Sequence, residues 1–314
     1  MARIPMLPTL SAAASALALA LPAAAAGPMF VTLWGSAGSG PGQFSFAHHL
    51  AVAPSGDVYV GDLLNNRVQR FSSSGAFLGA WAVPGADGVA VAPDGTVYVV
   101  RTSSIGHYSS TGSLLDSWGS AGSGDGQFNT PIDVAVNVAG DVFVTELGNA
   151  RVQKFGPTGT FLASWGAPGT GDGQFTFPLG ISITPGGDVL VSDVGANQVQ
   201  RFSNAGAFLQ RWSGSGPGAL NAPGRAAVDP DGNLVVPDGG NNRIAVYAGD
   251  GTFKFAWGAA GSGNGQFNHP TCIAFNAAGQ VYVMDKDNAR VQEFESVATP
   301  AVRITWGAVK RAYR

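Results

Sequence analysis

The sequence predicts an all-β fold class, and three observations lead to this prediction. The stretch PIDVAVNVAGDVFVTELGNARVQKFGPTGTFLASW, residues 131–165, holds four short apolar runs rich in Val, Phe and Ile and separated by Gly or Asn. Runs of this length and composition are typical of strands rather than helices. Similar stretches occur six times along the chain. Tryptophans accompany them at intervals of 37 to 47 residues: Trp34, Trp81, Trp118, Trp165, Trp212 and Trp257. A period in the forties with four strands per unit is typical of a β-propeller, so we expect six four-stranded antiparallel blades.

The N-terminal segment differs in composition from the rest of the chain. Arg3 is its only charge, residues 10–21 form an Ala/Leu run, and the alanines 24–26 offer a cleavage site. This pattern is typical of a secretory signal peptide, and the run is shorter than the roughly 20 residues that a membrane span needs. A membrane anchor or a buried helix is the alternative. We expect a signal peptide over residues 1–26, a propeller over 28–296 and a C-terminal tail over 297–314, in a secreted or extracytoplasmic protein.

Composition agrees with a chain of tight turns and buried strands, since it has 46 glycines and only 12% charged residues. The single cysteine, Cys272, excludes an intrachain disulfide, so stability must come from packing and ring closure. The net charge is −3, and the basic residues recur on the third strand of the blades rather than on one face. Phosphate binding requires a concentrated basic surface, and we therefore expect no nucleic-acid partner.

Ring closure is predicted from spacing. Residues 30–34 match a fourth strand with no first three before them, and residues 302–306 offer a second candidate near the other end. In the first five units the last aromatic residue of the third strand precedes the tryptophan by ten residues, but Phe294 precedes Trp306 by twelve and the turn glycine is missing. We expect the N-terminal strand to close the sixth blade against residues 290–294, which removes exposed strand edges.

Two motifs recur in the connections. The second-to-third connections read D-x-x-N-x-R, as in Asp62, Asn65 and Arg67, and recurrence favours a structural role, with the carboxylate holding loop amides or the Arg. The fourth-to-first connections read GSAGSGPGQF, GSAGSGDGQF, GAPGTGDGQF and GAAGSGNGQF. No helix follows these glycines, so a phosphate cradle is disfavoured, and one Asp does not make a calcium loop. We expect flexible turns whose Gln-Phe docks on the blade.

Together these motifs, with IAV, VYV, R-[VI]-Q-x-F and FxxxW runs, resemble the NHL repeat family over residues 30–294. The second copy is degenerate, because Arg101 replaces the acidic residue and the GQF segment before it is missing. The resemblance implies a six-bladed propeller. It implies function poorly, since similar propellers serve as protein- or RNA-binding modules, sensor ectodomains and a few lyases or hydrolases, some of them with channel histidines or acidic ligands that hold a metal.

The channel mouth is the candidate site. The residues just before the first strands are, in order, His49, Gly88, Asp133, Gly180, Arg225 and Cys272. The family norm at this position is Gly, so we expect His49, Asp133, Arg225 and Cys272 to surround one opening, with His48 and His269 nearby. A His/Cys/Asp cluster can bind a soft metal, and a His–Cys pair can be nucleophilic. A wet entrance that tolerates any polar residue is the simpler interpretation. With His107 on a third strand, three channel histidines from separate blades are not available.

From the sequence we therefore expect a monomeric, non-catalytic binding module with no cofactor and no metal, and with a protein, peptide or glycan ligand at the loop-bearing face. The alternative is an enzyme, a lactonase-like hydrolase or a lyase, with a metal-assisted site at the same opening. The basic tail, with Lys310, Arg311 and Arg314, is interpreted as a sorting or cell-surface attachment segment, an extra edge strand or a frayed end.

Overall fold

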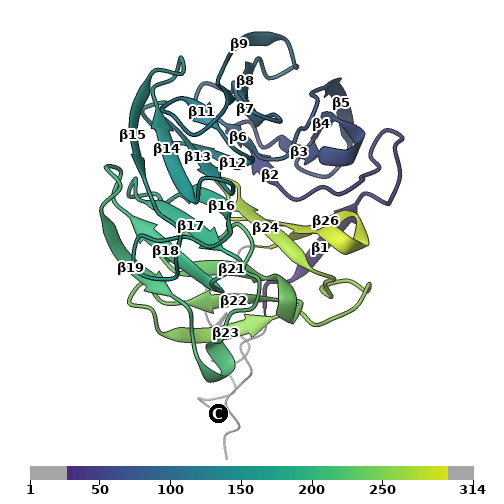
Figure 1. The fold of residues 1–314 in the computed structure, drawn as a ribbon. Coiled ribbons are helices and arrows are strands. Elements are labelled where there is room, and N and C mark those ends of the chain that lie inside the picture. The colour runs from purple at the N-terminus through teal and green to yellow at the C-terminus, as the bar shows by residue number, and fades with distance from the viewer. Residues whose placement is uncertain (1–26, 296–314) are drawn as a thin grey trace, which may run out of the picture.

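Four-stranded antiparallel sheets make up nearly all of the regular structure in the computed structural model, which describes residues 27–295. Six such sheets are arranged as blades around a central axis, with first strands such as β12, β16 and β24 near the middle (Figure 1). The prediction of a six-bladed, all-β propeller is confirmed. The predicted signal peptide and C-terminal tail lie outside the described residues. Among residues 27–295, no helix has the length and apolarity that a membrane crossing requires.

Blades one to five each use four consecutive strands. Blade one contains β2 (Leu50–Val52), β3 (Val58–Asp62), β4 (Arg67–Phe71) and β5 (Phe77–Ala82), and blade two contains β6 (Val89–Val91), β7 (Val97–Val100), β8 (Ile105–Tyr108) and β9 (Leu114–Trp118). Blade three contains β12 (Pro131–Val136), β13 (Val142–Glu146), β14 (Arg151–Phe155) and β15 (Phe161–Trp165). Blade four contains β16 (Pro178–Ile183), β17 (Val189–Asp193), β18 (Gln198–Phe202) and β19 (Phe208–Trp212). Blade five contains β20 (Ala227–Val228), β21 (Leu234–Asp238), β22 (Arg243–Tyr247) and β23 (Phe253–Trp257).

Short elements complete the described chain. β10 (Ser120–Ala121) and β11 (Gln127–Phe128) form a parallel pair, and four 3-10 turns lie in the connections: η1 (Leu63–Asn65), η2 (Gly216–Gly218), η3 (Gly239–Asn241) and η4 (Lys286–Asn288).

Blade six joins the two ends of the described chain. It contains β24 (Pro270–Phe275), β25 (Val281–Asp285), β26 (Arg290–Phe294) and, outermost, β1 (Phe30–Trp34). β1 runs antiparallel to β26, with Phe30 opposite Phe294 and Trp34 opposite Val291 (Figure 1). The predicted closure by the N-terminal strand is therefore confirmed.

The hydrophobic core is divided into six clusters, and each lies between neighbouring blades. The cluster between blades six and one combines Trp34, Tyr282 and Met284 with Leu50 and Phe71. A blade cannot cover both of its faces alone, so burial of these side chains requires the next blade. The closed ring supplies a next blade for every blade.

The periodic tryptophans and glycines of the sequence meet across these blade boundaries. A Cβ added to Gly75, in the turn between β4 and β5, would lie 2.5 Å from the Trp34 indole of the preceding blade. Gly112 faces Trp81, and Gly159 faces Trp118, in the same way. These glycines also have a positive φ, which L-residues adopt at an energetic cost. Trp34, Trp81 and Trp118 therefore each cover the outer turn of the blade that follows.

The D-x-x-N-x-R motif forms a hydrogen-bonded latch, as predicted from its recurrence. The buried Asp62 carboxylate accepts hydrogen bonds from Asn65 Nδ2 at 2.8 Å, Arg67 Nε at 2.8 Å and the Ser45 amide at 2.7 Å. Arg67 also donates to the carbonyls of Gly40 and Gln43. The carboxylate thereby joins the second-to-third connection of blade one to the connection that enters blade one from blade six.

The GQF segments pack on the blades, as expected. Phe44 is buried in the core, and Gln43 Oε1 folds back to accept a hydrogen bond from the Gly40 amide at 2.9 Å. Both kinds of long connection therefore lie at one end of the blades, which we call the loop-bearing face. The short turns between first and second strands, such as Gly186–Gly187, lie at the opposite end, which we call the turn face.

Candidate functional site

The starts of the first strands meet at the loop-bearing end of the central channel. His49 directly precedes β2 and Arg225 precedes β20, as expected. Asp133 and Cys272 instead lie within β12 and β24, because these strands begin at a proline and a register shift follows it. Neighbouring blades are joined here through their backbones: the Arg225 amide donates to the Thr271 carbonyl at 2.8 Å.

Two histidines share one carboxylate in this region. Nδ1 of His49 lies 3.1 Å from Oδ1 of Asp87, and Nδ1 of His48 lies 3.3 Å from the same oxygen. His49 is fully buried, whereas the His48 side chain is 14% exposed. Because a carboxylate only accepts hydrogen bonds, both Nδ1 atoms carry the proton when they bond to it. Asp87 therefore fixes the orientation of both rings.

Charge interactions extend this pair across the channel. Nε2 of His49 lies 3.8 Å from Oδ2 of Asp133, which belongs to blade three. Among residues 27–295, no hydrogen-bond partner satisfies this buried nitrogen. Asp133 is itself fixed by the amides of Val134 and Ile181, both at 2.9 Å. These contacts connect blades one, three and four through one carboxylate.

Arg225 crosses the channel from blade five to the opposite blade two. Its Nη1 donates to the Val89 carbonyl at 3.0 Å and lies 3.5 Å from Oδ1 of Asp133. The Arg225 side chain is only 12% exposed, and Asp133 is fully buried. We call His48, His49, Asp87, Asp133 and Arg225 the channel cluster.

The electrostatics of the channel cluster favour charged groups despite burial. Burial disfavours the imidazolium, but the charge of Asp133 and the hydrogen bond to Asp87 outweigh it and raise the pKa of His49. Burial likewise opposes ionisation of Asp87, yet the hydrogen bonds from His48 and His49 hold the pKa of that carboxyl well below its usual range. An ionised Asp87 and a protonated His49 stabilise each other.

Cys272 does not join the cluster through its side chain. Its buried Sγ contacts the Leu50 carbonyl at 3.5 Å, and burial raises the pKa of the thiol to about 11. The adjacent Thr271 donates to the His48 carbonyl at 2.8 Å. Cys272 therefore lies close to the backbone of blade one, because blade six is the neighbour of blade one in the ring. It is a neutral thiol in a packed interface.

The expectation of an open ring of polar side chains needs correction. His49, Asp133 and Cys272 are fully buried, and Arg225 is nearly so. The starts of the six first strands lie close together around the axis. Oppositely charged side chains there attract one another, and their contacts close this end of the channel. Within residues 27–295, no group of three or more His, Cys, Asp or Glu side chains has an arrangement suited to a metal ion. A role for these residues in ligand binding stays a prediction.

His269 lies outside the channel cluster, on the loop-bearing face. Its ring is 42% exposed and its Nδ1 is 3.5 Å from Asp287. Beside it, the exposed Phe46 ring contacts both His48, with centroids 4.5 Å apart, and Lys286, whose Nζ lies 4.5 Å from the ring centroid. We call Phe46, His48, His269, Lys286 and Asp287 the blade one–six patch.

Sequence reasoning missed Phe46. It follows the GQF phenylalanine by two positions, where Phe177 stands in blade four, and these two side chains are 49% and 38% exposed. Phe46 also has a φ of 60°, a left-handed conformation that is rare for a bulky residue. The sequence does hold a signal for Phe46. Two blades have a large apolar residue at this loop position, whereas Thr130 and His269 occupy it in other blades.

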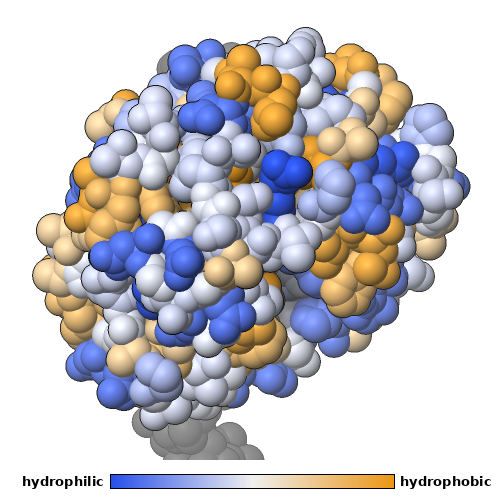
Figure 2. Space-filling model, turned by 45° about the horizontal axis from the view of Figure 1, so that its top comes forward, coloured by the Kyte–Doolittle hydropathy of each residue, from blue (hydrophilic) through white to orange (hydrophobic). Residues whose placement is uncertain are grey.

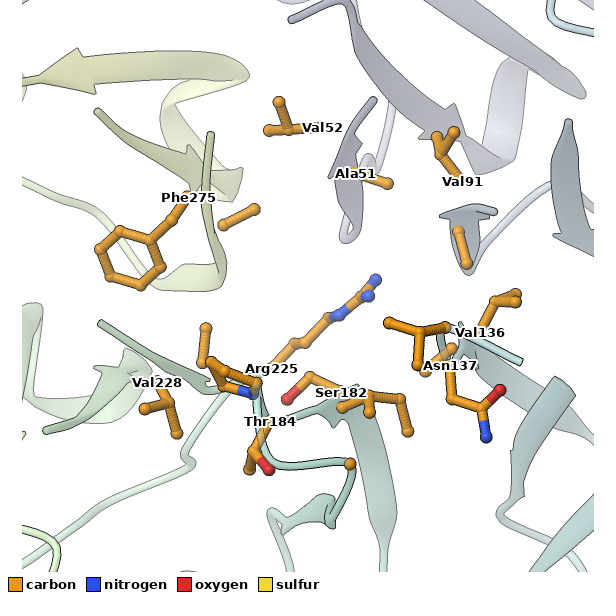
Figure 3. Close-up of a pocket in the computed structure, with 18 of the residues that line it drawn as sticks. Ala51, Val52, Val91, Val136, Asn137, Ser182, Thr184, Arg225, Val228 and Phe275 are labelled. Carbon is orange, nitrogen blue, oxygen red and sulfur yellow. The ribbon is translucent and has the colours of Figure 1, made fainter. Parts of the chain in front are cut away.

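The opposite end of the channel contains a cavity of about 510 Å³. All six first strands line it, mostly with small or branched apolar side chains, together with Phe275 and the neutral polar residues Asn137, Ser182 and Thr184 (Figure 3). Among residues 27–295, Arg225 is the one charged residue of its walls. Val138 and Pro185, in turns of blades three and four, are exposed at its turn-face rim. The first strands read as short Ala/Val runs in the sequence, but nothing in those runs shows where the channel is closed.

Comparison with known proteins agrees with this architecture. The chain is a six-bladed β-propeller, a fold that it shares with virginiamycin B lyase from Staphylococcus aureus at a TM-score of 0.60 and 14% identity, over 87% of this chain and 96% of that one. It also resembles a gluconolactonase, XC5397 from Xanthomonas campestris, at a TM-score of 0.62 and 18% identity, over 80% of this chain and 87% of that one. At these identities the likeness is one of fold.

The repeats themselves have a more specific match. Blades three, four and six of this chain carry the NHL repeat, over residues 128–155, 175–202 and 267–294. The human NHL repeat-containing protein 3 is 36% identical over 78 residues, which is 23% of this chain and 22% of that protein. The match spans about a fifth of that relative's length, so it describes the repeat rather than the whole protein.

Proposed function

We propose that this chain is an extracytoplasmic, non-catalytic binding module that engages a protein or peptide ligand with its loop-bearing face. The observation that carries the proposal is the exposed Phe46 ring of the blade one–six patch. Its left-handed backbone conformation costs about 1–2 kcal/mol, and half of its apolar surface faces solvent. The equivalent residues Thr130 and His269 share the left-handed conformation, so the conformation belongs to the repeat. The large apolar ring that stands in it at Phe46 gains nothing from folding while it is exposed, whereas a bound partner that covers the ring buries it.

The surroundings of Phe46 fit recognition of a side chain. Aromatic residues at the centre of an interface contribute much of the binding energy when a partner excludes water from them. At the edge of the patch Asp287 pairs with Lys286 at 2.8 Å and with His269 at 3.5 Å, and these groups with His48 give the apolar ring a polar rim. Leu64, 64% exposed in η1, lies next to this patch because its amide bonds to the Ser45 carbonyl. An apolar ligand residue flanked by a carboxylate fits this surface.

Other faces of the molecule are weaker candidates for the binding surface. On the face shown in Figure 2, hydrophobic residues form separate patches with polar residues between them. The outer strands of blades one to four each expose a leucine near 50%: Leu78, Leu115, Leu162 and Leu209. These leucines are spread over different blades, one on the outer strand of each, so they recur with the repeat more widely than Phe46 does.

The test is panning of a phage-displayed random peptide library on the immobilised mature protein. Peptides enriched on the wild-type chain are expected to lose about tenfold or more in affinity on a Phe46→Ala variant. Leu209→Ala is a matched control, because Leu209 is also 49% exposed but lies on the outer strand β19. Enriched peptides that bind Phe46→Ala and wild type equally would show that the patch is not the binding surface.

A second candidate function is catalysis at the same end of the channel, and one contact favours it. His48 is partly exposed while Asp87 orients its ring, which is the arrangement that a general base requires. The similar folds of a lyase and a gluconolactonase are consistent with an enzyme but do not place a site here. A stoichiometric Ca²⁺ or Zn²⁺ in the purified protein, with lactonase or lyase turnover abolished by His48→Gln, would favour this candidate over the binding module.

A further inference from the structure

We propose that the cavity at the turn-face end of the channel binds a small carboxylate with an apolar chain, and that Arg225 recognises its carboxylate. This site is separate from the blade one–six patch and opens on the opposite face. The inference therefore does not depend on the proposed function.

The first reason is the size and lining of the cavity. Its volume of about 510 Å³ lies within the roughly 300–1,000 Å³ that small-molecule sites usually have. Side chains of Val52, Val91, Val136, Val228 and Phe275 stand around it (Figure 3). Such walls bury an aliphatic or aromatic group favourably.

The second reason is that the Arg225 guanidinium is only partly used. Nη1 bonds to the Val89 carbonyl and approaches Asp133. In the part of the chain that the structure describes, Nε and Nη2 have no hydrogen-bond partner, and neither is among the buried unsatisfied atoms. The guanidinium extends into the cavity, with its nitrogens between Ala51 and Val136 (Figure 3). These remaining donors are available to a carboxylate, the partner whose geometry the guanidinium matches best.

The third reason is the charge balance behind Arg225. Asp133 does not line the cavity, and its two oxygens already accept from the amides of Val134 and Ile181 while His49 approaches from the other side. The Asp133 charge is therefore shared among several donors rather than neutralising Arg225 alone. With otherwise neutral walls, the cavity presents one cation to a bound molecule.

Ser182 and Thr184 add polar groups near the same end without adding charge. The Ser182 hydroxyl donates to the Ala226 carbonyl at 2.6 Å, and the Thr184 hydroxyl accepts from the Asp188 amide at 3.1 Å. The Ser182 proton is thus already used, and the Thr184 hydroxyl is uncharged, so neither group separates a carboxylate from an alcohol by charge. Discrimination between anionic and neutral ligands is therefore assigned to Arg225.

The experiment is isothermal titration calorimetry of the full mature chain at pH 7 with octanoate, 1-octanol and octylamine. These probes share one apolar chain and differ in the head group. Octanoate is expected to bind at least tenfold more tightly than 1-octanol, and octylamine not to bind. Equal affinity for octanoate and octanol would overturn the proposal, because the cavity would then be selecting an apolar chain only. Absence of octanoate binding at millimolar concentration would overturn it as well.

Three variants locate the site. Arg225→Gln is expected to weaken octanoate binding at least tenfold, Arg225→Lys to weaken it less, and Val91→Phe to abolish it by filling the cavity while keeping the arginine. Arg211→Gln is the matched control, because Arg211 is 40% exposed on β19, away from the cavity. If Arg225→Gln fails to fold, Val91→Phe and Arg225→Lys still test the proposal. Unchanged octanoate binding in Val91→Phe would place the site elsewhere.

The two proposals fail separately. Phe46→Ala should leave octanoate binding unchanged, and Val91→Phe, which fills the cavity without touching the channel cluster, should leave peptide binding at the loop-bearing face unchanged. Loss of octanoate binding in Phe46→Ala would contradict the assignment of the two ligands to opposite faces.

Discussion

Trp34 lies opposite Val291 in one sheet, so that the first strand of the described chain is the outermost strand of the last blade. The Trp34 ring then packs between blades, with its centroid 6.1 Å from Phe71 in blade one and 6.0 Å from Tyr282 in blade six. One residue thereby joins the last blade to the first, both through its backbone and through its side chain.

Removing this strand should open the ring. Deletion of residues 29–35 exposes β26 and the cluster around Phe71, and we expect a fall of about 10 °C or more in Tm, since 1 kcal/mol shifts Tm by roughly 2–4 °C in a chain of this size. Differential scanning calorimetry measures it. Deletion of residues 302–314 is the control, because the spacing from Phe294 to Trp306 does not fit the repeat. A larger loss from the second deletion than from the first would contradict the closure.

Asp285 tests the carboxylate latch. It is buried and accepts from Arg290 at 2.7 Å, Asn288 at 2.8 Å and the Asn268 amide at 2.7 Å. Asp285→Ala removes the carboxylate that neutralises the buried Arg290 guanidinium, which would keep only carbonyl acceptors, so the free energy of unfolding should fall by about 3–5 kcal/mol in urea denaturation.

The conservative variant refines this test. Blade three uses Glu146 at the equivalent position, with Asn149 and Arg151 both at 2.6 Å. Asp285→Glu should therefore retain most of the stability that Asp285→Ala loses. Asp250→Ala, at an exposed turn, serves as the surface control and should change little. If the latch contributed nothing to stability, Asp285→Ala, Asp285→Glu and Asp250→Ala would have the same free energy of unfolding.

Two glycines separate backbone strain from packing. Gly75 and Gly187 have φ values of 84° and 87°, but a Cβ on Gly75 would collide with Trp34, whereas a Cβ on Gly187 meets nothing within 4 Å. Gly187→Ala should cost about 1 kcal/mol from its conformation alone. Gly75→Ala should cost clearly more, because the indole must also move. Equal losses in urea denaturation would mean that the Trp34–Gly75 contact tolerates the methyl group.

Two histidines should give pH dependences of opposite sign. The pKa of His49 is raised above its value of 6.5 by Asp133 and Asp87, against the opposing effects of burial and Arg225. Its contribution to stability is therefore complete below pH 6.5 and is lost as the pH rises through the folded-state pKa. His107, stacked on Tyr98 at 4.2 Å, has its pKa lowered by burial, which outweighs Asp94 and Asp116. Its contribution is lost as the pH falls below 6.5, where the unfolded state takes up the proton first.

The measurement is the free energy of unfolding from pH 5 to pH 8 for wild type, His49→Gln and His107→Gln. The wild type minus His49→Gln difference should decrease with rising pH, and the corresponding difference for His107→Gln should increase. A difference for His49→Gln that does not change with pH would contradict a protonated imidazole between Asp87 and Asp133.

Much of the fold follows from local sequence patterns. Strand runs and turn glycines specify the strands of a blade because each is read within one repeat. The tryptophan period then specifies how many blades there are and the register of residues 30–34. The latch at Asp62 was predictable for the same reason, since a residue that recurs in several blades serves the blade. The contact of Trp34 with Gly75 crosses a blade boundary, so no pattern within one repeat predicts it.

The candidate site depended on the tertiary structure instead. The sequence by itself determined that polar residues replace glycine at the starts of four first strands and that those starts share an axis. Only the closed ring decided that Asp133 lies between His49 and Arg225, because residues on non-adjacent blades approach each other only when the channel is narrow. The same contacts close the loop-bearing end and leave a cavity at the turn face, and no pattern within a single repeat carries that information.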